Sequence, residues 1–358
     1  MTKSKCIFFY IRLMSYHDDE LNLRLLRYLL SGEGVHVNVS ELSRELDIHW
    51  ATAKKKLEYL YENGILNTPF YPFIQVFEEY PLLVLVKADM PRSEGIKNFY
   101  RDDSHIFAAF SCMEGFYNTF LIEFFEGLEE YHSWRGEIVK QDKIPDRGER
   151  TPAHAEFFSN KLTFKYEPNC FIDKMAEEFD KEGFVELAGH KIEGVTFQIL
   201  ERVMRGECIR TNYSSIGRDI GVNRKTVKRR IQNLLEKNII QRPKCFFPYL
   251  LVPPGYNLIV TMIEAISDID EIKEHLRKDG NIPRAIETST ERYNFLVFSA
   301  FESVDEFFKW GERLNSKYPE KIGAISKTIL SSKMIHLIEP QKVSLGFVEK
   351  KIRDQNEN

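Results

Sequence analysis

An internal repeat constrains the fold of this chain more than any other feature of its sequence. Residues 47–66 and 221–240 match without a gap when 174 is subtracted from the second set of numbers. After a two-residue insertion the offset becomes 176, and the new register continues as far as Trp310 on Trp134. Because unrelated segments do not hold register over such a length, we predict a tandem duplication in which each half carries two modules.

The repeated stretch has the pattern of a helix-turn-helix. In residues 221–240, apolar side chains recur at helical spacing and basic side chains occupy the opposite face. A second short helix is expected at residues 214–220, with Ser214 or Ser215 as its N-cap. Gly221 permits the tight turn between the two helices. Two short helices of this kind, the second one cationic, are typical of proteins that read the DNA major groove.

The segment after each motif changes to a mixed pattern of strands and helices. In the second half, strands are expected at 258–263, 284–288, 293–300 and within 325–337, with helices at 268–278 and 305–317. The first half has the same order, and residues 155–166 are expected to supply its last strand. The order β-α-β-β-α-β is that of a ferredoxin-like α+β sandwich.

The predicted fold class is therefore α+β, a tandem repeat of a winged helix-turn-helix followed by a ferredoxin-like domain. Residues 65–66 and 73–77 are expected to pair as the first wing. The predicted domains are two winged helix-turn-helix modules (15–80 and 190–255), two ferredoxin-like domains (81–167 and 256–340), a linker helix (168–189) and a charged tail (341–358).

Charge is distributed unevenly between the two halves. The whole chain has a net charge of −4, which by itself does not suggest a nucleic-acid partner. Residues 200–244, however, hold twelve Lys or Arg against four Asp or Glu, whereas residues 26–70 hold five against six. The second half should therefore dominate attraction to phosphate.

The remaining composition favours a cytoplasmic protein without a metal site. The five cysteines are scattered, and none is paired in a C-x-x-C motif, so neither a disulfide framework nor a zinc site is expected. The longest apolar run, at residues 82–86, is too short to span a bilayer. The N-terminal segment is expected to lie on the body as a strand or helix, and Met14 is an alternative to Met1 as the start.

The predicted DNA-contacting residues lie on the two cationic helices. They are Trp50, Thr52, Lys54, Lys55 and Lys56 in the first half, and Asn223, Arg224, Lys225, Thr226, Lys228, Arg229 and Arg230 in the second. Arginines suit guanine edges, whereas lysines and threonines suit phosphates. Asn223 is expected to act first as an N-cap. Trp50 has two interpretations, a contact with the DNA sugar or packing against the wing aromatics.

The module order resembles the Lrp/AsnC (feast/famine) family of bacterial and archaeal transcription regulators. The residues that carry the resemblance are 40–66 and 214–240 for the helix-turn-helix, and 115–124 and 291–300 for a loop and strand of the α/β domain. The resemblance implies double-stranded DNA as partner, an amino-acid effector in the α/β domains and a homodimer formed through them. Gly115 matches a glycine of the family's effector loops, whereas Glu291 occupies the corresponding place in the second half.

These observations predict a sequence-specific, DNA-binding transcription regulator with two non-identical recognition helices on one pseudo-dimeric chain. No enzymatic activity, cofactor, metal or membrane contact is expected. Because the helices differ, the predicted DNA site is asymmetric.

Two alternatives stay open. Sirohaem decarboxylases resemble the same two-module architecture and occur as paired or fused halves. Their chemistry is expected to depend on His, Tyr and Arg in the α/β cleft, for which His105 and Tyr117 are candidates here. The other alternative is a protein-interaction scaffold with a vestigial DNA module.

Overall fold

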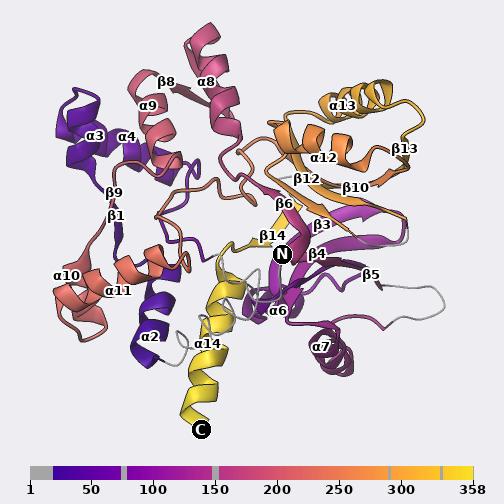
Figure 1. Ribbon diagram of the computed structural model, residues 1–358, viewed down its shortest axis with the longest axis horizontal. Helices are drawn as coiled ribbons and strands as arrows, with labels where there is room; N and C mark the ends of the chain where they lie inside the picture. Colours follow the sequence, from indigo (N-terminus) through magenta and orange to yellow (C-terminus); the bar gives the residue numbers. More distant parts are fainter. Residues whose placement is uncertain (1–18, 74–78, 147–152, 289–291, 331–333, 358) are drawn as a thin grey trace.

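Two antiparallel sheets form the body of the molecule, and the helix-turn-helix elements lie together at one end (Figure 1). The computed structural model describes residues 19–73, 79–146, 153–288, 292–330 and 334–357. The predictions for the N-terminal segment and for the wing strand at 74–77 lie outside these residues. None of the described helices is long and apolar enough to cross a membrane.

The two sheets have the same construction. The first contains β2 (Leu82–Ala88), β3 (Ile106–Glu114), β4 (Tyr117–Phe125), β5 (Ala153–Ser159) and β14 (Ile335–Ile338), in the order β14-β3-β4-β2-β5. The second contains β6 (Thr163–Tyr166), β10 (Asn257–Ala265), β11 (Arg284–Glu287), β12 (Phe295–Phe301) and β13 (Ile322–Leu330), in the order β13-β10-β12-β11-β6. Helices α6 (Glu94–Asp102) and α7 (Leu128–Lys140) accompany the first sheet, and α12 (Ile269–Lys278) and α13 (Val304–Lys317) the second.

Each half gives one strand to the sheet of the other half. Strand β6 follows β5 in the chain but pairs with β11, and β14 follows β13 but pairs with β3. The expectation that residues 155–166 close the first sheet is therefore wrong for their second part. The first sheet uses β5, and the next strand crosses to the second sheet.

The helix that precedes each helix-turn-helix also packs on the other half. The first half provides α2 (Glu20–Leu30), β1 (Val35–Val37), α3 (Val39–Glu45) and α4 (Trp50–Glu62), and the second half provides α9 (Gly194–Met204), β9 (Ile209–Thr211), α10 (Tyr213–Asp219) and α11 (Arg224–Glu236). Every one of the second-half elements begins and ends 174 residues after its counterpart. Strands β1 and β9 pair antiparallel where the two chain segments meet.

Contacts between the halves show which helices pack together. Tyr28 of α2 donates a hydrogen bond to Asp219 Oδ2 at the end of α10 (2.6 Å). In the other unit, Arg202 of α9 donates to Glu45 Oε2 at the end of α3 (3.0 Å). The first helix of each half thus completes the helix-turn-helix of the other half (Figure 1). Each three-helix unit therefore combines a contiguous helix-turn-helix (α3–α4 or α10–α11) with the first helix of the other half, and does not correspond to one stretch such as 15–80.

Local sequence explains the ends of these helices. Asn212 accepts a hydrogen bond from Ser215 N–H (3.0 Å) and caps α10, so the expected caps Ser214 and Ser215 were placed too late. Asn223 accepts from Lys225 N–H (2.8 Å) and caps α11 as predicted. Gly221 has the left-handed φ of 74° that the turn requires.

In the part of the chain that the structure describes, the segments after α4 and α11 pair with each other. Phe70 bridges Lys244 and Phe73 bridges Ile240 in antiparallel sense. Phe73, the one described residue of the wing strand expected at 73–77, therefore pairs with the other half and not with 65–66. We call these two segments, residues 63–73 and 237–256, the crossing segments. They connect both helix-turn-helix units to the end of the stacked sheets.

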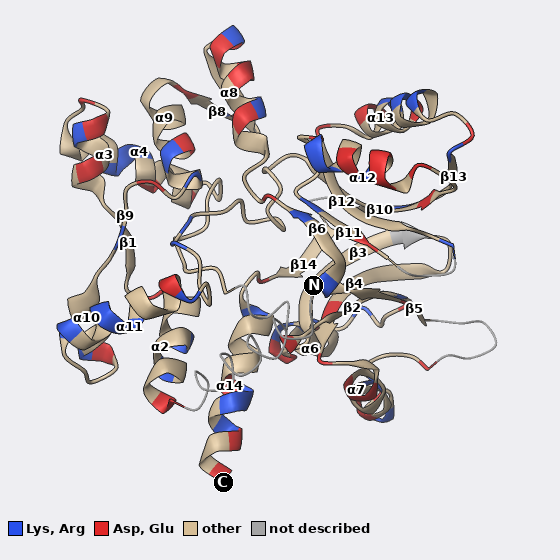
Figure 2. Cartoon of the chain, viewed as in Figure 1, with Lys and Arg blue, Asp and Glu red and all other residues tan. Residues whose placement is uncertain are grey.

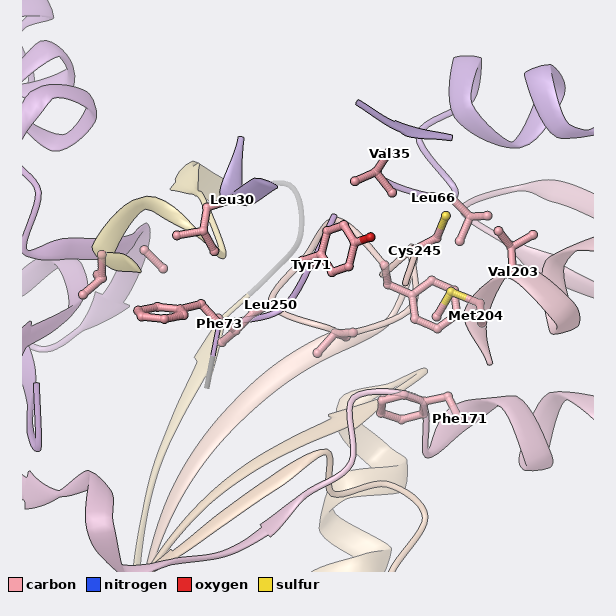
Figure 3. Close-up of a cluster of buried hydrophobic side chains, with 14 of the residues drawn as sticks. Leu30, Val35, Leu66, Tyr71, Phe73, Phe171, Val203, Met204, Cys245 and Leu250 are labelled. Atoms are coloured by element: carbon pink, nitrogen blue, oxygen red, sulfur yellow. The ribbon is translucent and has the colours of Figure 1, made fainter. Parts of the chain in front are cut away.

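Three apolar clusters hold the molecule together. One lies between the first sheet and its helices, and another between the second sheet and its helices. The third runs between the inner faces of the two sheets into the exchanged helices. Figure 3 shows part of it, where Leu66 and Tyr71 of the first half lie near Val203 and Met204 of the second.

The connecting segments are ordered. Helix α8 (Phe171–Glu182) and the hairpin of β7 (Phe184–Leu187) and β8 (His190–Glu193) link the halves. The segment expected to be a charged, frayed tail forms α14 (Lys342–Glu357), which packs beside α2. Its apolar residues, including Val343 and Phe347, are buried, which accounts for its order.

Candidate functional site

The predicted DNA-contacting residues are mostly exposed, but they form two separate groups. On α11, Asn223, Arg224, Lys225, Lys228 and Arg229 are exposed and Thr226 is half-buried. On α4, Trp50, Thr52, Lys54 and Lys55 are exposed and Lys56 is half-buried. Figure 2 shows these basic segments on the two helix-turn-helix units, on either side of the β1–β9 pair.

Two of these residues differ from the sequence interpretation. Arg230 turns toward α2, where its Nη1 donates to Asn22 Oδ1 (2.9 Å) and to Asp19 Oδ2. This contact between the halves makes Arg230 a structural residue. Trp50 is 46% exposed and has Lys54 Nζ 5.5 Å from its ring centroid, so its ring lies at the surface of the molecule.

The glycine loop proposed for an effector is a simple strand turn. Gly115 adopts a φ of 61° between β3 and β4, with nothing within 4 Å of where a Cβ would lie. Asn118 binds the backbone of Met90, and Asn294 accepts from Ala265 N–H (2.6 Å). Both asparagines therefore have structural roles in their own halves.

One candidate site is a cavity at the end of the two stacked sheets, which we call the central cavity. It contains about 1000 Å³ of space free of atoms, including a mouth open to solvent. The space that the centre of a water-sized sphere can occupy is much smaller, about 80 Å³. Its described lining residues come from both sheets, both crossing segments and the start of α14: Phe70, Pro72, Phe73, Phe107, Ile122, Phe124, Tyr166, Gln241, Phe246, Leu250, Leu251, Pro283, Arg284, Phe298, Pro340, Gln341, Val343 and Ser344.

Arg284 brings a positive charge into this apolar cavity. It stands at the start of β11, and its guanidinium lies 5.8 Å from the ring centroid of Phe124 and 5.7 Å from that of Phe298. Its Nη2 donates a hydrogen bond to the side-chain oxygen of buried Asn160. Burial lowers the pKa of Arg284 to about 10, so the group still carries its charge at neutral pH. A cation held between two aromatic rings is a suitable anchor for a carboxylate.

Tyr166 accompanies Arg284 because of the strand exchange. The two residues are direct partners across the antiparallel pair of β6 and β11, which places their side chains on the same face of the sheet. Burial raises the pKa of Tyr166, and the nearby Arg284 only partly offsets this. The phenol therefore remains protonated at neutral pH and can donate a proton or a hydrogen bond into the cavity.

The residues considered earlier for a tetrapyrrole enzyme do not meet in this cavity. His105 Nδ1 is hydrogen-bonded to Phe124 O (2.9 Å), and its ring stacks on that of Phe125 with the ring centroids 4.4 Å apart. His105 therefore lies on the helix-covered side of the first sheet. Tyr117 is at the other end of β4, seven residues from Phe124, which corresponds to about 23 Å along a strand. Neither residue lines the central cavity.

No protein-family model matches the sequence, and no curated protein matches it either. Among solved structures, the siroheme decarboxylase NirDL superposes with a TM-score of 0.51 at 11% identity, covering 94% of this chain and 100% of that one. The same enzyme in complex with an iron-uroporphyrin III analogue gives a TM-score of 0.52 at 11% identity, covering 92% and 98%. The two proteins share a fold.

A regulator also matches, over a smaller part of the chain. AsnC of E. coli covers 37% of this chain and 88% of its own, with a TM-score of 0.30 and 20% identity. A likeness of that extent supports no argument about function. At 11% identity, the likeness to NirDL establishes the mixed α+β architecture across the whole chain and nothing finer.

The prediction that the chain is not an enzyme is contradicted by this comparison. The architecture that was interpreted as a regulator's is found, over almost the whole chain, in an enzyme. The helix-turn-helix motif therefore gives no reason to exclude catalysis. In the described residues, no group of three or more His, Cys, Asp or Glu side chains is arranged to hold a metal ion.

Sequence reasoning missed Arg284 and Tyr166. One local signal was available for Arg284, because it lies two residues before buried Ile286 in a strand and so shares the inward face. For Tyr166 no comparable signal exists, since its position depends on which sheet β6 joins. The two residues are 118 positions apart in the sequence and meet only through the exchange.

Proposed function

We propose that this chain is an enzyme that binds a carboxylated tetrapyrrole in the central cavity and removes a carboxyl group from it. The observation that carries the proposal is Arg284, a cation held between two phenylalanine rings in a cavity otherwise walled by apolar and neutral side chains. The proposal is supported by the fold, which covers the whole length of a siroheme decarboxylase.

The cavity residues have distinct roles in this proposal. The phenylalanines contact the faces of a planar macrocycle and exclude water, which strengthens electrostatic interactions inside the site. Arg284 orients a carboxylate and stabilises the negative charge that remains when CO₂ leaves. The bond between carboxyl carbon and side chain breaks, its electron pair stays on the substrate carbon, and the protonated hydroxyl of Tyr166 supplies the proton that this carbon takes up.

The experiment is a titration of the purified chain with sirohaem, followed by mass spectrometry to detect loss of CO₂ from the macrocycle. Arg284→Gln should weaken binding about 10- to 150-fold, since a hydrogen bond to a charged group contributes ~1.5–3 kcal/mol. Tyr166→Phe should retain binding and slow CO₂ loss. Arg313→Gln, which changes an exposed arginine on α13, should alter neither. Absence of any macrocycle binding by the unchanged chain contradicts the proposal.

A second proposed function is binding to duplex DNA through α11. Four exposed cations on this helix, Arg224, Lys225, Lys228 and Arg229, support it. Each phosphate contact that is lost should reduce the slope of log affinity against log salt by about 0.9. The quadruple alanine variant should therefore lose a few units of slope. Replacing Arg224 and Arg229 by Ala should weaken binding more than replacing Lys54 and Lys55, and equal losses from these two double mutants would contradict the dominance of the second half.

Three broader proposals accompany these. The fixed offset of 174 residues between helix-turn-helix elements supports an origin by tandem duplication. Because α4 and α11 differ in sequence, a DNA site for this chain would be asymmetric. The scattered cysteines, of which Cys112, Cys170, Cys208 and Cys245 are free thiols in the structure, support a reducing, cytoplasmic location.

A further inference from the structure

The turn that carries the chain from the first sheet to the second contains a buried asparagine. Asn160 begins the short helix η1 (Asn160–Leu162), between β5 and β6, and is 1% exposed. Its backbone N–H donates to Pro81 O (2.6 Å), and its backbone oxygen accepts from Thr163 Oγ1 (2.7 Å). The connection between the two sheets therefore fixes both the position and the burial of this residue.

The side chain of Asn160 holds Arg284. The guanidinium Nη2 donates a hydrogen bond to Asn160 Oδ1. Because a guanidinium has only donors, the atom that faces it must be the amide oxygen and not the amide nitrogen. In the described part of the chain, Asn160 Nδ2 is buried and has no hydrogen-bond partner. Asn160 thus binds the arginine through its oxygen and leaves one buried donor unpaired.

An aspartate would be the better partner for Arg284 if hydrogen bonding alone mattered. It has nearly the shape of asparagine, it would form a charge-assisted pair with the guanidinium, and it has no amide N–H to leave unpaired. It would, however, place a negative charge against Arg284, which is the one charged side chain among the described residues that line the cavity. The amide of Asn160 fixes the arginine without neutralising it.

Two aromatic rings orient the same guanidinium, again without charge. Phe124 belongs to the first sheet and Phe298 to the second, and their ring centroids lie 5.8 Å and 5.7 Å from the guanidinium. The face of an aromatic ring attracts a cation although the ring carries no net charge. Together with Asn160, the rings direct the positive charge of Arg284 without supplying a counter-charge of their own.

We infer that Asn160 is the positioning residue that gives the central cavity its preference for anions, because it orients Arg284 without neutralising its charge. The inference rests on the proposed function and deepens it by naming a residue that determines specificity for a carboxylate. Asn160 is not among the described residues that line the cavity. It therefore acts through Arg284 and not by contact with the ligand.

The test uses two small probes of the same shape, naphthoate and the uncharged naphthamide, titrated onto the full chain and followed by saturation-transfer NMR. The unchanged chain should bind the carboxylate roughly tenfold more tightly than the amide, or better. Asn160→Asp should lower the affinity for naphthoate by roughly tenfold or more and change that for naphthamide by less than about twofold. Damage to the fold would weaken both probes, so the difference between them reports the charge.

Asn98→Asp is the matched control. Asn98 is exposed on α6 and accepts a hydrogen bond from Arg101 Nη1 (2.9 Å), so this change places the same charge beside an arginine outside the cavity. It should alter neither affinity. Asn160→Ala removes the acceptor without adding a charge. It should weaken naphthoate binding less than Asn160→Asp does, because the charge of Arg284 is then not neutralised.

The outcomes separate the inference from the proposed function. Equal loss of both probes in the Asn160→Asp variant overturns the inference, because Asn160 then has a structural role alone. The inference is also overturned if the unchanged chain does not prefer the carboxylate, whether both probes bind equally or neither binds.

Sirohaem is titrated in parallel. If it binds the unchanged chain and the Asn160→Asp variant equally, the inference is wrong and the proposed function stands. If it does not bind the unchanged chain but the preference for naphthoate is found and depends on Asn160, the proposed function is contradicted and the role of Asn160 stands.

Discussion

Replacement of Glu123 by Gln should stabilise the protein, and the gain should grow with pH. Glu123 is fully buried on β4, on the same face as Leu121 and Phe125 in the cluster beneath α6 and α7. In the described part of the chain, neither of its carboxyl oxygens has a hydrogen-bond partner. The residue 176 positions later, Ser299, satisfies its hydroxyl by donating to Ile259 O (3.1 Å).

The charged state of this glutamate is strongly disfavoured in the folded protein. Burial raises the pKa of Glu123 well above its usual value, the negative charge of Asp103 raises it further, and Arg135 offsets only part of this. Between the pKa of the unfolded chain, about 4.3, and that of the folded chain, the folded state holds one proton more. The free energy of unfolding therefore falls by ~1.4 kcal/mol for each pH unit in that interval.

Urea denaturation at several pH values measures this effect. From about pH 5 to about pH 6, the Glu123→Gln variant should gain ~1.4 kcal/mol relative to the unchanged chain. Glu129→Gln is an exposed change on α7. Its free energy of unfolding should vary with pH in parallel with that of the unchanged chain. If the curve of stability against pH for the Glu123→Gln variant also runs parallel to that of the unchanged chain, the carboxyl keeps its ordinary titration and the reasoning is refuted.

Two further predictions concern the helix-turn-helix units. Gly217→Ala should lower the free energy of unfolding by ~1–3 kcal/mol, because the added Cβ would lie 2.6 Å from Val222 O. The control Gly311→Ala on α13 meets nothing within 4 Å and should raise it by up to ~1 kcal/mol. Thermal unfolding of both variants measures the difference. Arg230→Ala should lower the free energy of unfolding by ~1–3 kcal/mol, because the contacts of Arg230 to α2 are lost. Arg229→Ala should change it by less than ~0.5 kcal/mol. Of the two variants, only Arg229→Ala should reduce the salt slope of DNA binding.

The sequence predicted those elements whose formation is decided locally. The helical pattern within 221–240 corresponds to α11, because helical periodicity and the Asn223 cap act over a few residues. The mixed α+β class followed from the alternation of patterns in the same way. Trp134 and Trp310, which match each other in the repeat, also occupy equivalent places, and they donate to Asp103 (2.8 Å) and Asp279 (2.7 Å).

The exchange between the halves could not be predicted from local pattern. Nothing within β6 or β14 specifies which sheet it joins, since both sheets offer an apolar edge of the same construction. The central cavity depends on that choice, because Tyr166 reaches Arg284 only when β6 pairs with β11. A candidate site formed by two exchanged halves therefore cannot be predicted from the sequence when each repeat is taken as a separate domain.

The strand exchange has a consequence for how the chain is made. The first sheet lacks its outer strand until β14 leaves the ribosome, and β14 begins at Ile335 whereas β3, its partner, ends at Glu114. At a synthesis rate of ~5–20 residues per second, the edge of β3 waits roughly 10–40 s for that partner. Throughout that interval a nascent chain presents an uncovered strand edge, which makes it a client for chaperones and for pairing with another nascent copy.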